Sequence, residues 1–186
     1  MNSHFNFRED LWQVFLLTLP LIVGGVLHMI VVKKDILSYL KKPIHQRWFG
    51  QNKTWRGFVV MPFLTWPGVV ISQKLETLID PSSQLLNLRP GWLLALALGV
   101  GYCLAELPNS FLKRRLGIKA GLASDKNKWF FVLLDQADSA FGCLFAYQLF
   151  LPLPWRIFWE TIVFGTLLHL VINRSLYIIG VRKNPY

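Results

Sequence analysis

The sequence predicts an all-α polytopic membrane protein with about five transmembrane helices, and three observations support this fold class. Of the 186 residues, 53% are hydrophobic and 15% are aromatic, and the mean hydropathy is +0.39. These values are too apolar for an ordinary soluble domain. Five apolar stretches each approach the roughly 20 residues that a membrane-spanning helix needs, and together they use up the chain. We therefore expect one integral-membrane domain over residues 1–186.

The predicted spans follow one another with short connections. They cover residues 11–32, 57–75, 91–108, 129–151 and 157–179. The first lacks the basic leader of a signal peptide and is long enough to be retained as a span. The second contains Pro62, Pro67 and Gly68, which predict a kinked or broken helix. A tryptophan near the end of four spans supports their boundaries, because indole favours the membrane interface: Trp12, Trp92, Trp129 and Trp155.

Loop charges predict the orientation in the membrane. Two segments are rich in cations, one after the first span (Lys33, Lys34, Lys41, Lys42, Arg47, Lys53, Arg56) and one after the third (Lys113, Arg114, Arg115, Lys119, Lys126, Lys128). Residues 76–90 carry a single cation, Arg89. The positive-inside rule then places both basic loops in the cytoplasm of a cell (inner) membrane, with the N-terminus outside and the C-terminus inside.

The net charge of +10 lies mostly in these loops and not along one soluble face. We therefore expect anionic lipid headgroups and phosphates as partners, and no nucleic acid.

Asp135 and Asp138 form a pair of carboxylates within the fourth span. A carboxylate at mid-membrane costs roughly 2.5–3.5 kcal/mol, so the pair needs a compensating partner. Residues three apart share a helix face, and both acids can therefore point at one divalent cation, for which Mg²⁺ is the preferred candidate. The alternative is that the acids only pair with cations such as Lys113, Arg115 or Arg174.

The basic segment 109–117 lies between the third and fourth spans. Pro108 is expected to end the third span, Asn109 to cap a short interfacial helix and Gly117 to stop it. Lys113, Arg114 and Arg115 would then lie at the membrane surface, where guanidinium groups fit phosphate oxygens. Beside the acids we prefer this interpretation to a simple topology signal.

A third polar segment precedes the second span. Gly50 and Gly57 bracket several donors that could approach a phosphate or a base: Asn52, Lys53, Thr54 and Arg56. The pattern lacks the ending of a Walker motif. Other polar residues inside the spans have simpler explanations and lower weight. His28 is expected to be a packed histidine, Thr166, His169 and Asn173 can form an interhelical hydrogen-bond network, and Glu160 is expected to be solvated near the outer end.

Three motifs occur in a fixed order at residues 50–57, 110–118 and 135–138. They read Gly-x-Asn-Lys-Thr-Trp-Arg-Gly, Ser-Phe-x-Lys-Arg-Arg-Leu-Gly-Ile and Asp-Gln-x-Asp. In this order and spacing they resemble the CDP-archaeol synthase family, membrane CTP transferases related to CDP-diacylglycerol synthases. The resemblance covers nearly the whole chain. It implies that CTP and a membrane lipid phosphate, of archaetidic type or phosphatidic acid, become CDP-lipid and pyrophosphate with Mg²⁺.

The resemblance also implies roles for residues of the cytoplasmic loops and helix ends. Asp135 and Asp138 would hold Mg²⁺ against the triphosphate, with Lys113 and Arg114 as further catalytic residues. Phosphate or nucleotide contacts would come from Asn52, Lys53, Thr54, Arg56, Ser110 and Arg115. Glu106 stands where the family commonly has an aspartate, which makes it a third candidate metal ligand. Pro108 also departs from the family pattern and stiffens the chain before the basic segment.

Two other functions remain candidates from the sequence. A CTP-dependent lipid-alcohol kinase could use a similar nucleotide site. A non-catalytic membrane protein that binds acidic lipid, or a small transporter that uses the acids as an ion path, would need no intact metal and phosphate motifs. We expect a membrane-embedded groove for the lipid, formed mainly by the first, second and fifth spans. Their apolar residues carry no code for an ether or an ester lipid, and the sequence carries none for an oligomeric state.

Overall fold

The computed structural model describes residues 7–79, 81, 84–120 and 128–182. Five long helices dominate it: α1 (Phe7–Lys33), α3 (Trp55–Ile79), α4 (Gly91–Arg115), α5 (Lys128–Phe150) and α6 (Trp155–Ile178). Shorter elements lie in the connections: η1 (Ser38–Leu40), α2 (Gln46–Phe49) and η2 (Leu86–Leu88). Among the described residues, these five long helices are the ones with the length and hydropathy of membrane spans. The predicted all-α, five-span architecture is therefore confirmed.

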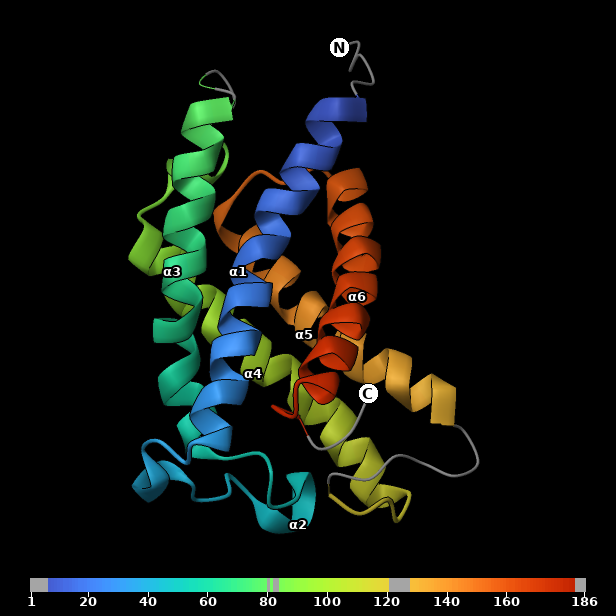
Figure 1. Cartoon of the computed structure of the whole chain (residues 1–186). Helices are drawn as coiled ribbons and strands as arrows, with labels where there is room; N and C mark the ends of the chain where they lie inside the picture. Colours follow the sequence, from blue (N-terminus) through green and yellow to red (C-terminus); the bar gives the residue numbers. More distant parts are fainter. Residues whose placement is uncertain (1–6, 80, 82–83, 121–127, 183–186) are drawn as a thin grey trace.

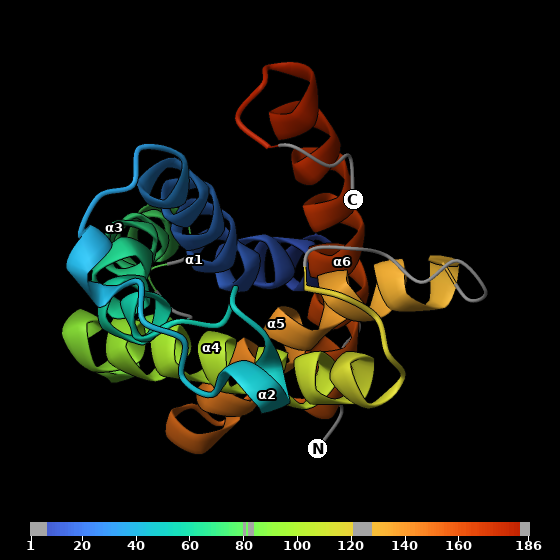
Figure 2. The same cartoon turned by 90° about the horizontal axis from the view of Figure 1, so that it is seen from below.

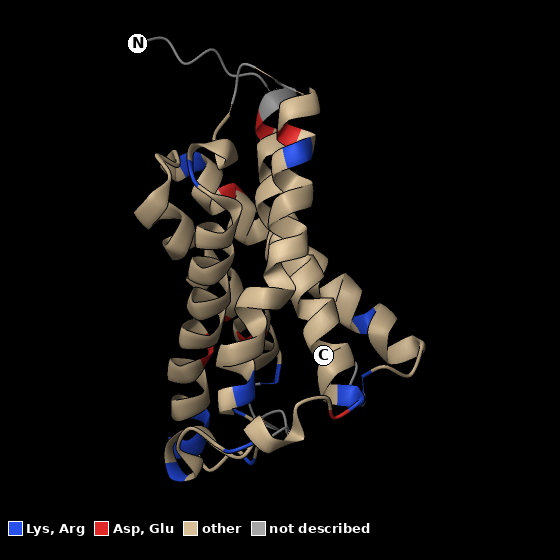
Figure 3. Cartoon of the chain, turned by 90° about the vertical axis from the view of Figure 1, so that its left-hand side faces the viewer, with Lys and Arg blue, Asp and Glu red and all other residues tan. Residues whose placement is uncertain are grey.

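The helices form a bundle in which α1, α3 and α6 lie in front of the inclined α4 and α5 (Figure 1). The N-terminus of α1, the C-terminal end of α3 and the connection α5–α6 lie at one end. The connection α1–α3 and the C-terminal ends of α4 and α6 lie at the other. Lysine and arginine residues gather at this second end, which we call the basic end (Figure 3). The described residues of the two basic segments therefore lie at the same end of the bundle.

Helix α3 runs without a break through both of its prolines, so of the two predicted forms, kinked or broken, the broken one was wrong. Hydrogen bonds and packing around the prolines support the helix there. Thr65 Oγ1 lies 3.0 Å from the carbonyl oxygens of Met61 in α3 and of Ala95 in α4. Gly99 of α4 packs directly on the backbone at Pro62, where a Cβ would overlap. Close packing of α4 therefore holds α3 helical where the sequence alone predicts an interruption.

Helix α4 also continues through a proline, and two predictions based on Pro108 were wrong. Pro108 does not end the span, and Asn109 is not an N-cap but lies within the helix. A proline inside a helix costs about 3 kcal/mol. Asn109 and Lys113, one turn apart on the same face, both bond to α5 carboxylates, and these contacts hold the last turns in place.

Gly117 ends the helix that carries the basic segment, as expected, but this helix is α4 itself and not a separate interfacial helix. Gly117 has a positive φ of 74°, and the Ile118 amide donates to the Lys113 carbonyl oxygen at 2.9 Å. This is the hydrogen-bond pattern of a glycine C-cap, which satisfies carbonyls that the helix leaves free.

Small residues set the spacing between α4 and α5. A Cβ on Gly142 would overlap the carbonyl oxygen of Gly101, so the two backbones are in contact there. Such close approach is typical of helix pairs in membranes. Cys103 and Cys143 lie near this contact, and both are buried free thiols. Rigid packing here fixes the position of α5, which carries the acid pair.

Buried Glu76 organises the opposite end of the bundle. Its carboxylate accepts hydrogen bonds from the backbone amides of Leu86 and Asn87 and from the Asn87 side chain, at 2.9–3.1 Å. These bonds attach the η2 turn to the end of α3. Glu76 is therefore a structural acid, far from the basic end.

Candidate active site

A cavity of about 510 Å³ opens at the basic end of the bundle. Its walls come from α1, α4, α5 and α6 and from the segment just before α3. Residues of all three sequence motifs line it: Asn52, Lys53, Ser110, Lys113, Arg114, Asp135, Gln136 and Asp138. The motifs, which lie far apart in the sequence, therefore meet at one place.

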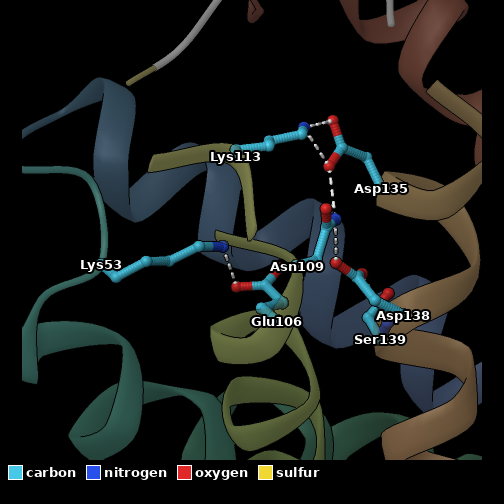
Figure 4. Close-up of polar contacts among 7 residues, drawn as sticks. All are labelled: Lys53, Glu106, Asn109, Lys113, Asp135, Asp138 and Ser139. Atoms are coloured by element: carbon cyan, nitrogen blue, oxygen red, sulfur yellow. Dashed lines mark hydrogen bonds and ion pairs between the residues drawn. The ribbon is translucent and has the colours of Figure 1, made fainter. Parts of the chain in front are cut away.

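Asp135 and Asp138 face α4 from one side of α5, and a single amide joins them (Figure 4). Asn109 Nδ2 donates to Asp135 Oδ1 at 2.7 Å and to Asp138 Oδ2 at 2.8 Å. Lys113 Nζ lies 2.5 Å from both carboxylate oxygens of Asp135. The backbone amide of Ser139 donates to the other oxygen of Asp138 at 2.6 Å. The two carboxylates thus converge on one point, as their spacing predicted.

The alternative interpretation, in which Asp135 and Asp138 only pair with cations, is also seen in part. Lys113 pairs with Asp135, whereas Arg174 lies over the ring of Tyr177 at 5.8 Å and Arg115 over the ring of Phe111 at 5.0 Å. One cation thus balances part of the charge of the acid pair, while the cavity leaves that pair open to a ligand.

Glu106 lies one turn before Asn109 on the same face of α4 and pairs with Lys53. The Lys53 Nζ to Glu106 Oε2 distance is 2.5 Å, and both side chains are about one quarter exposed, 25% and 23%. Burial disfavours the charged lysine, but the nearby carboxylates of Glu106, Asp138 and Asp135 outweigh it and raise the pKa of Lys53. Lys53 is therefore a firmly charged ammonium group that joins the segment before α3 to α4.

The segment before α3 also covers the basic residues of α4. Gly50 has a positive φ of 86°, and a Cβ there would lie 3.0 Å from Arg114 Nη1. Trp48 packs edge-on against Phe111, with ring centroids 6.1 Å apart. The Arg114 Nε is buried without a hydrogen-bond partner among the described residues. Arg114 thus faces the cavity with unused donor capacity, which suits an anionic ligand.

Three of the predicted contact residues do not line the cavity. Arg56 is buried and donates to Asp35 Oδ1 at 2.9 Å and to the Ile36 carbonyl oxygen at 3.2 Å, so it fastens the α1–α3 connection. Thr54 forms a backbone bridge with Pro43. Arg115 lies against Phe111, as described above. The structure gives these residues structural contacts in place of the expected position on the cavity wall.

A polar group on α5 and α6 lines the cavity, although the sequence pattern alone does not mark it as a site. Asn173 Nδ2 donates to Gln136 Oε1 at 2.5 Å, and His169 Nδ1 lies 3.4 Å from the Gln136 carbonyl oxygen. His169 and Asn173 are four residues apart, which is the spacing of one helix face. This periodicity was the available signal, but a packing network has the same pattern.

Arg182 is a further residue of the cavity wall that the sequence did not indicate. It follows the glycine that ends α6, and its backbone amide donates to the Leu176 carbonyl oxygen at 3.0 Å. This turn directs the chain back along the helix end. Partial burial lowers the pKa of Arg182, although a guanidinium stays charged at neutral pH.

Much of the lining that α1 and α6 contribute is apolar, with residues such as Leu21, Ile22, Val26, Ile172 and Leu176. The polar residues Thr18, His28, His169 and Asn173 lie among them. Among the described residues, α3 contributes none of the lining. The expectation that the first, second and fifth spans together form an apolar groove is therefore met by α1 and α6 but not by α3. Seen from the basic end, α6 stands apart from the α1–α3 pair (Figure 2).

The acid pair has the donor set of a divalent-cation site. Two carboxylates approach one point, and the Asn109 Oδ1 beside them is buried without a hydrogen-bond partner among the described residues. Carboxylate and amide oxygens suit Mg²⁺, which also keeps waters and binds substrate phosphates. Within the described part of the chain, three acidic, histidine or cysteine side chains do not gather around one point. Glu106 is held by Lys53 instead of joining the aspartates.

Comparisons with known proteins agree with the motifs that meet at this cavity. A family model described as CarS-like, CDP-archaeol synthase, matches residues 11–186. The chain is 34% identical over 154 residues to a CDP-archaeol synthase of Methanoculleus marisnigri, covering 76% of this chain and 82% of the relative.

Two further relatives carry the same name. The one from Halorubrum lacusprofundi is 32% identical, with 75% of this chain and 77% of the relative covered. The one from Thermofilum pendens is 29% identical, with 76% of this chain and 60% of the relative covered. No solved structure matches the chain. The family match over almost the whole chain shows that this protein belongs to the CDP-archaeol synthase family.

Proposed function

We propose that the protein is a CTP-dependent cytidylyltransferase that converts a membrane lipid phosphate to CDP-lipid and pyrophosphate. Membership of the CDP-archaeol synthase family implies this reaction class. The observation that carries the proposal is the cavity itself, which joins a charged end of cations and paired carboxylates to an apolar end between two membrane helices. A nucleoside triphosphate and a lipid phosphate need these two environments at one place.

The charged end would hold the triphosphate of CTP. Lys53, Lys113 and Arg114 supply positive charge on its walls, and Ser110 and Asn52 supply neutral donors. Oriented cations beside phosphate oxygens neutralise the charge that develops on the leaving pyrophosphate. The predicted roles of Thr54, Arg56 and Arg115 are better assigned to support of the loop and of the helix end, because none of these residues lines the cavity.

The apolar section between α1 and α6 would hold the first part of the lipid chains. Arg182 lies at its polar margin, and we assign it to the phosphate of the lipid. Because the charged and apolar sections are continuous, this phosphate would lie next to the bound nucleotide. Proximity of this kind lowers the barrier of a two-substrate reaction.

We propose that Asp135 and Asp138 hold Mg²⁺, with Glu106 positioned by Lys53 beside them. A bound divalent cation supplies charge neutralisation at the phosphates. An oxygen of the lipid phosphate attacks the α-phosphorus of CTP; a new P–O bond forms, the bond to the β-phosphate breaks, and pyrophosphate leaves with the electron pair. The residues of the chain orient the two phosphates and balance their charge, and a protein nucleophile is not required.

The orientation in the membrane belongs to the same proposal. The basic end would face the cytoplasm, where CTP is available, with the N-terminus outside and the C-terminus inside. We further propose that residues 1–186 act as one domain. The relatives are named for an archaeol lipid, so an ether-linked lipid phosphate is one candidate substrate and diacyl phosphatidic acid is the other.

Purified full-length protein in detergent tests the proposal. Pyrophosphate release would be measured with CTP, Mg²⁺ and a panel of ether-linked and ester-linked lipid phosphates. We expect turnover with at least one lipid, and a loss of about 100-fold or more in the Asp138→Asn variant. Glu160→Gln, at the opposite end of the bundle, is the matched control and should retain activity. Absence of turnover with every lipid, or full activity of Asp138→Asn, would contradict the proposal.

A further inference from the structure

Asn109 has a bonding pattern that a packing role does not explain. The residue is 6% exposed, and its one amide nitrogen donates to both aspartates of the acid pair. Only the donor end of an amide can satisfy two carboxylates. This arrangement leaves the other end, Oδ1, buried without a partner among the described residues. A buried polar atom without a partner is costly, so a second state that uses it would be favourable.

The amide nitrogen occupies the position that a cation would need. Asp135 Oδ1 and Asp138 Oδ2 both point at it from less than 3 Å. A small divalent cation also binds where two carboxylate oxygens converge. The amide NH₂ and a cation cannot both occupy this point, because the cation repels the partial positive charge of the amide protons.

Rotation of the side-chain amide resolves this conflict. A half turn about the last side-chain bond exchanges the nitrogen and the oxygen while the rest of Asn109 stays in place. The free Oδ1 would then face the acids, and amide oxygens are good ligands of hard cations.

We infer that Asn109 is a cation-responsive switch of the acid pair. Its amide nitrogen bridges Asp135 and Asp138 in the absence of metal, and its amide oxygen turns toward the cation or a cation-bound water when the metal is present. This inference rests on the proposed metal role of the two aspartates. Asn109 is thus a positioning residue. In either of its two states, its side-chain amide keeps Asp135 and Asp138 together before the substrate binds.

Asparagine-selective ¹⁵N labelling of the full-length protein in micelles observes the amide directly. The Asn109 side-chain signal, assigned with Asn109→Ser, should shift on titration with MgCl₂, first alone and then with CTP. Asn87 is an internal control, because its amide bonds to Glu76 at the opposite end of the bundle. An Asn87 signal that stays in place while the Asn109 signal moves supports the inference. An Asn109 signal that does not move at any Mg²⁺ concentration overturns it.

Metal affinity provides a second readout that does not depend on catalysis. Asn109→Asp replaces the amide by a third carboxylate, so Mn²⁺ binding measured by electron paramagnetic resonance should tighten about tenfold, since ligand charge tunes affinity. The same variant should have a lower Tm in EDTA than the wild type, because three acids then face one another. Equal or weaker Mn²⁺ binding would overturn the inference. If Asn109→Asp does not fold, the ¹⁵N spectra of the wild type still test the inference.

These outcomes separate the inference from the proposed function. If the wild type forms CDP-lipid and binds Mg²⁺ in a manner that requires Asp138, while the Asn109 amide stays unchanged, only the switch is refuted. If the wild type binds neither Mn²⁺ nor Mg²⁺ with or without CTP, the metal role of the aspartates and the switch fail together.

Discussion

Replacement of Lys53 by methionine tests the electrostatics of the cavity. The substitution keeps the length of the side chain but removes the ammonium that lies 2.5 Å from Glu106. Glu106 would then face Asp135 and Asp138 without its cation. Breaking a buried pair costs about 3–5 kcal/mol, and partial exposure of both side chains lowers this to about 2–3 kcal/mol. For a chain of this size, that loss lowers Tm by roughly 4–12 °C.

Thermal unfolding in detergent, followed by circular dichroism, measures this effect. Lys41→Met is the matched control, because its partner Asp35 is exposed and such pairs contribute about 0–1 kcal/mol. The double variant Lys53→Met/Glu106→Gln should regain most of the lost stability, since it leaves no uncompensated charge. A Lys53→Met variant within about 1 °C of the wild type would refute the reasoning, as would a double variant less stable than Lys53→Met alone.

Three further predictions concern the scaffold. Glu76→Ala removes the acceptor of several buried hydrogen bonds and should lower the free energy of unfolding by about 3 kcal/mol, whereas Glu160→Ala should lower it by less than about 1 kcal/mol. Equal effects of the two substitutions on thermal unfolding would contradict the account. Gly142→Ala should destabilise by about 2 kcal/mol or more, while Gly25→Ala, whose Cβ meets no neighbour, should not lower the Tm. Bonds from Arg56 and Lys41 lower the pKa of Asp35, so the stability that Asp35 contributes should be present above its ordinary pKa of 3.8 and be lost as the pH falls below it. The Tm values of wild type and Asp35→Asn should therefore converge below that pH, and a constant difference would refute the assignment.

The sequence predicted the spans well because hydrophobic length is a strong constraint in a membrane. It also predicted that the acid pair and the basic segment belong to one site. Charged groups inside an apolar bundle need polar partners, and few are available there, so the charged groups tend to lie together. The contact of Lys113 with Asp135 follows from this constraint.

The last turns of α4 could not be predicted from the local sequence. Pro108 favours an interruption, and Asn109 favours a cap. Both preferences are outweighed by tertiary contacts to α5 that no local pattern shows. A usable signal was present, however: Glu106, Asn109 and Lys113 have the spacing of one helix face, which indicates a polar stripe instead of a loop.

The roles of Arg56 and Asn173 show a second limit of sequence reasoning. Arg56 stands in a motif full of phosphate-binding residue types, yet its side chain points to the α1–α3 connection. Asn173 lies in the last predicted span, outside the three motifs, yet it lines the cavity and bonds to Gln136. Side-chain direction depends on helix rotation and packing, which residue type alone does not determine.

The fate of the CTP phosphates tests the central claim most directly. The purified protein would be incubated with a lipid phosphate, or with the corresponding lipid alcohol, and CTP labelled at either the α- or the γ-phosphate. With the lipid phosphate, our account predicts that the α-label enters the organic phase as CDP-lipid and that the γ-label stays in water as pyrophosphate. Transfer of the γ-label to the lipid alcohol, with release of CDP, would show a kinase and contradict the cytidylyltransferase mechanism.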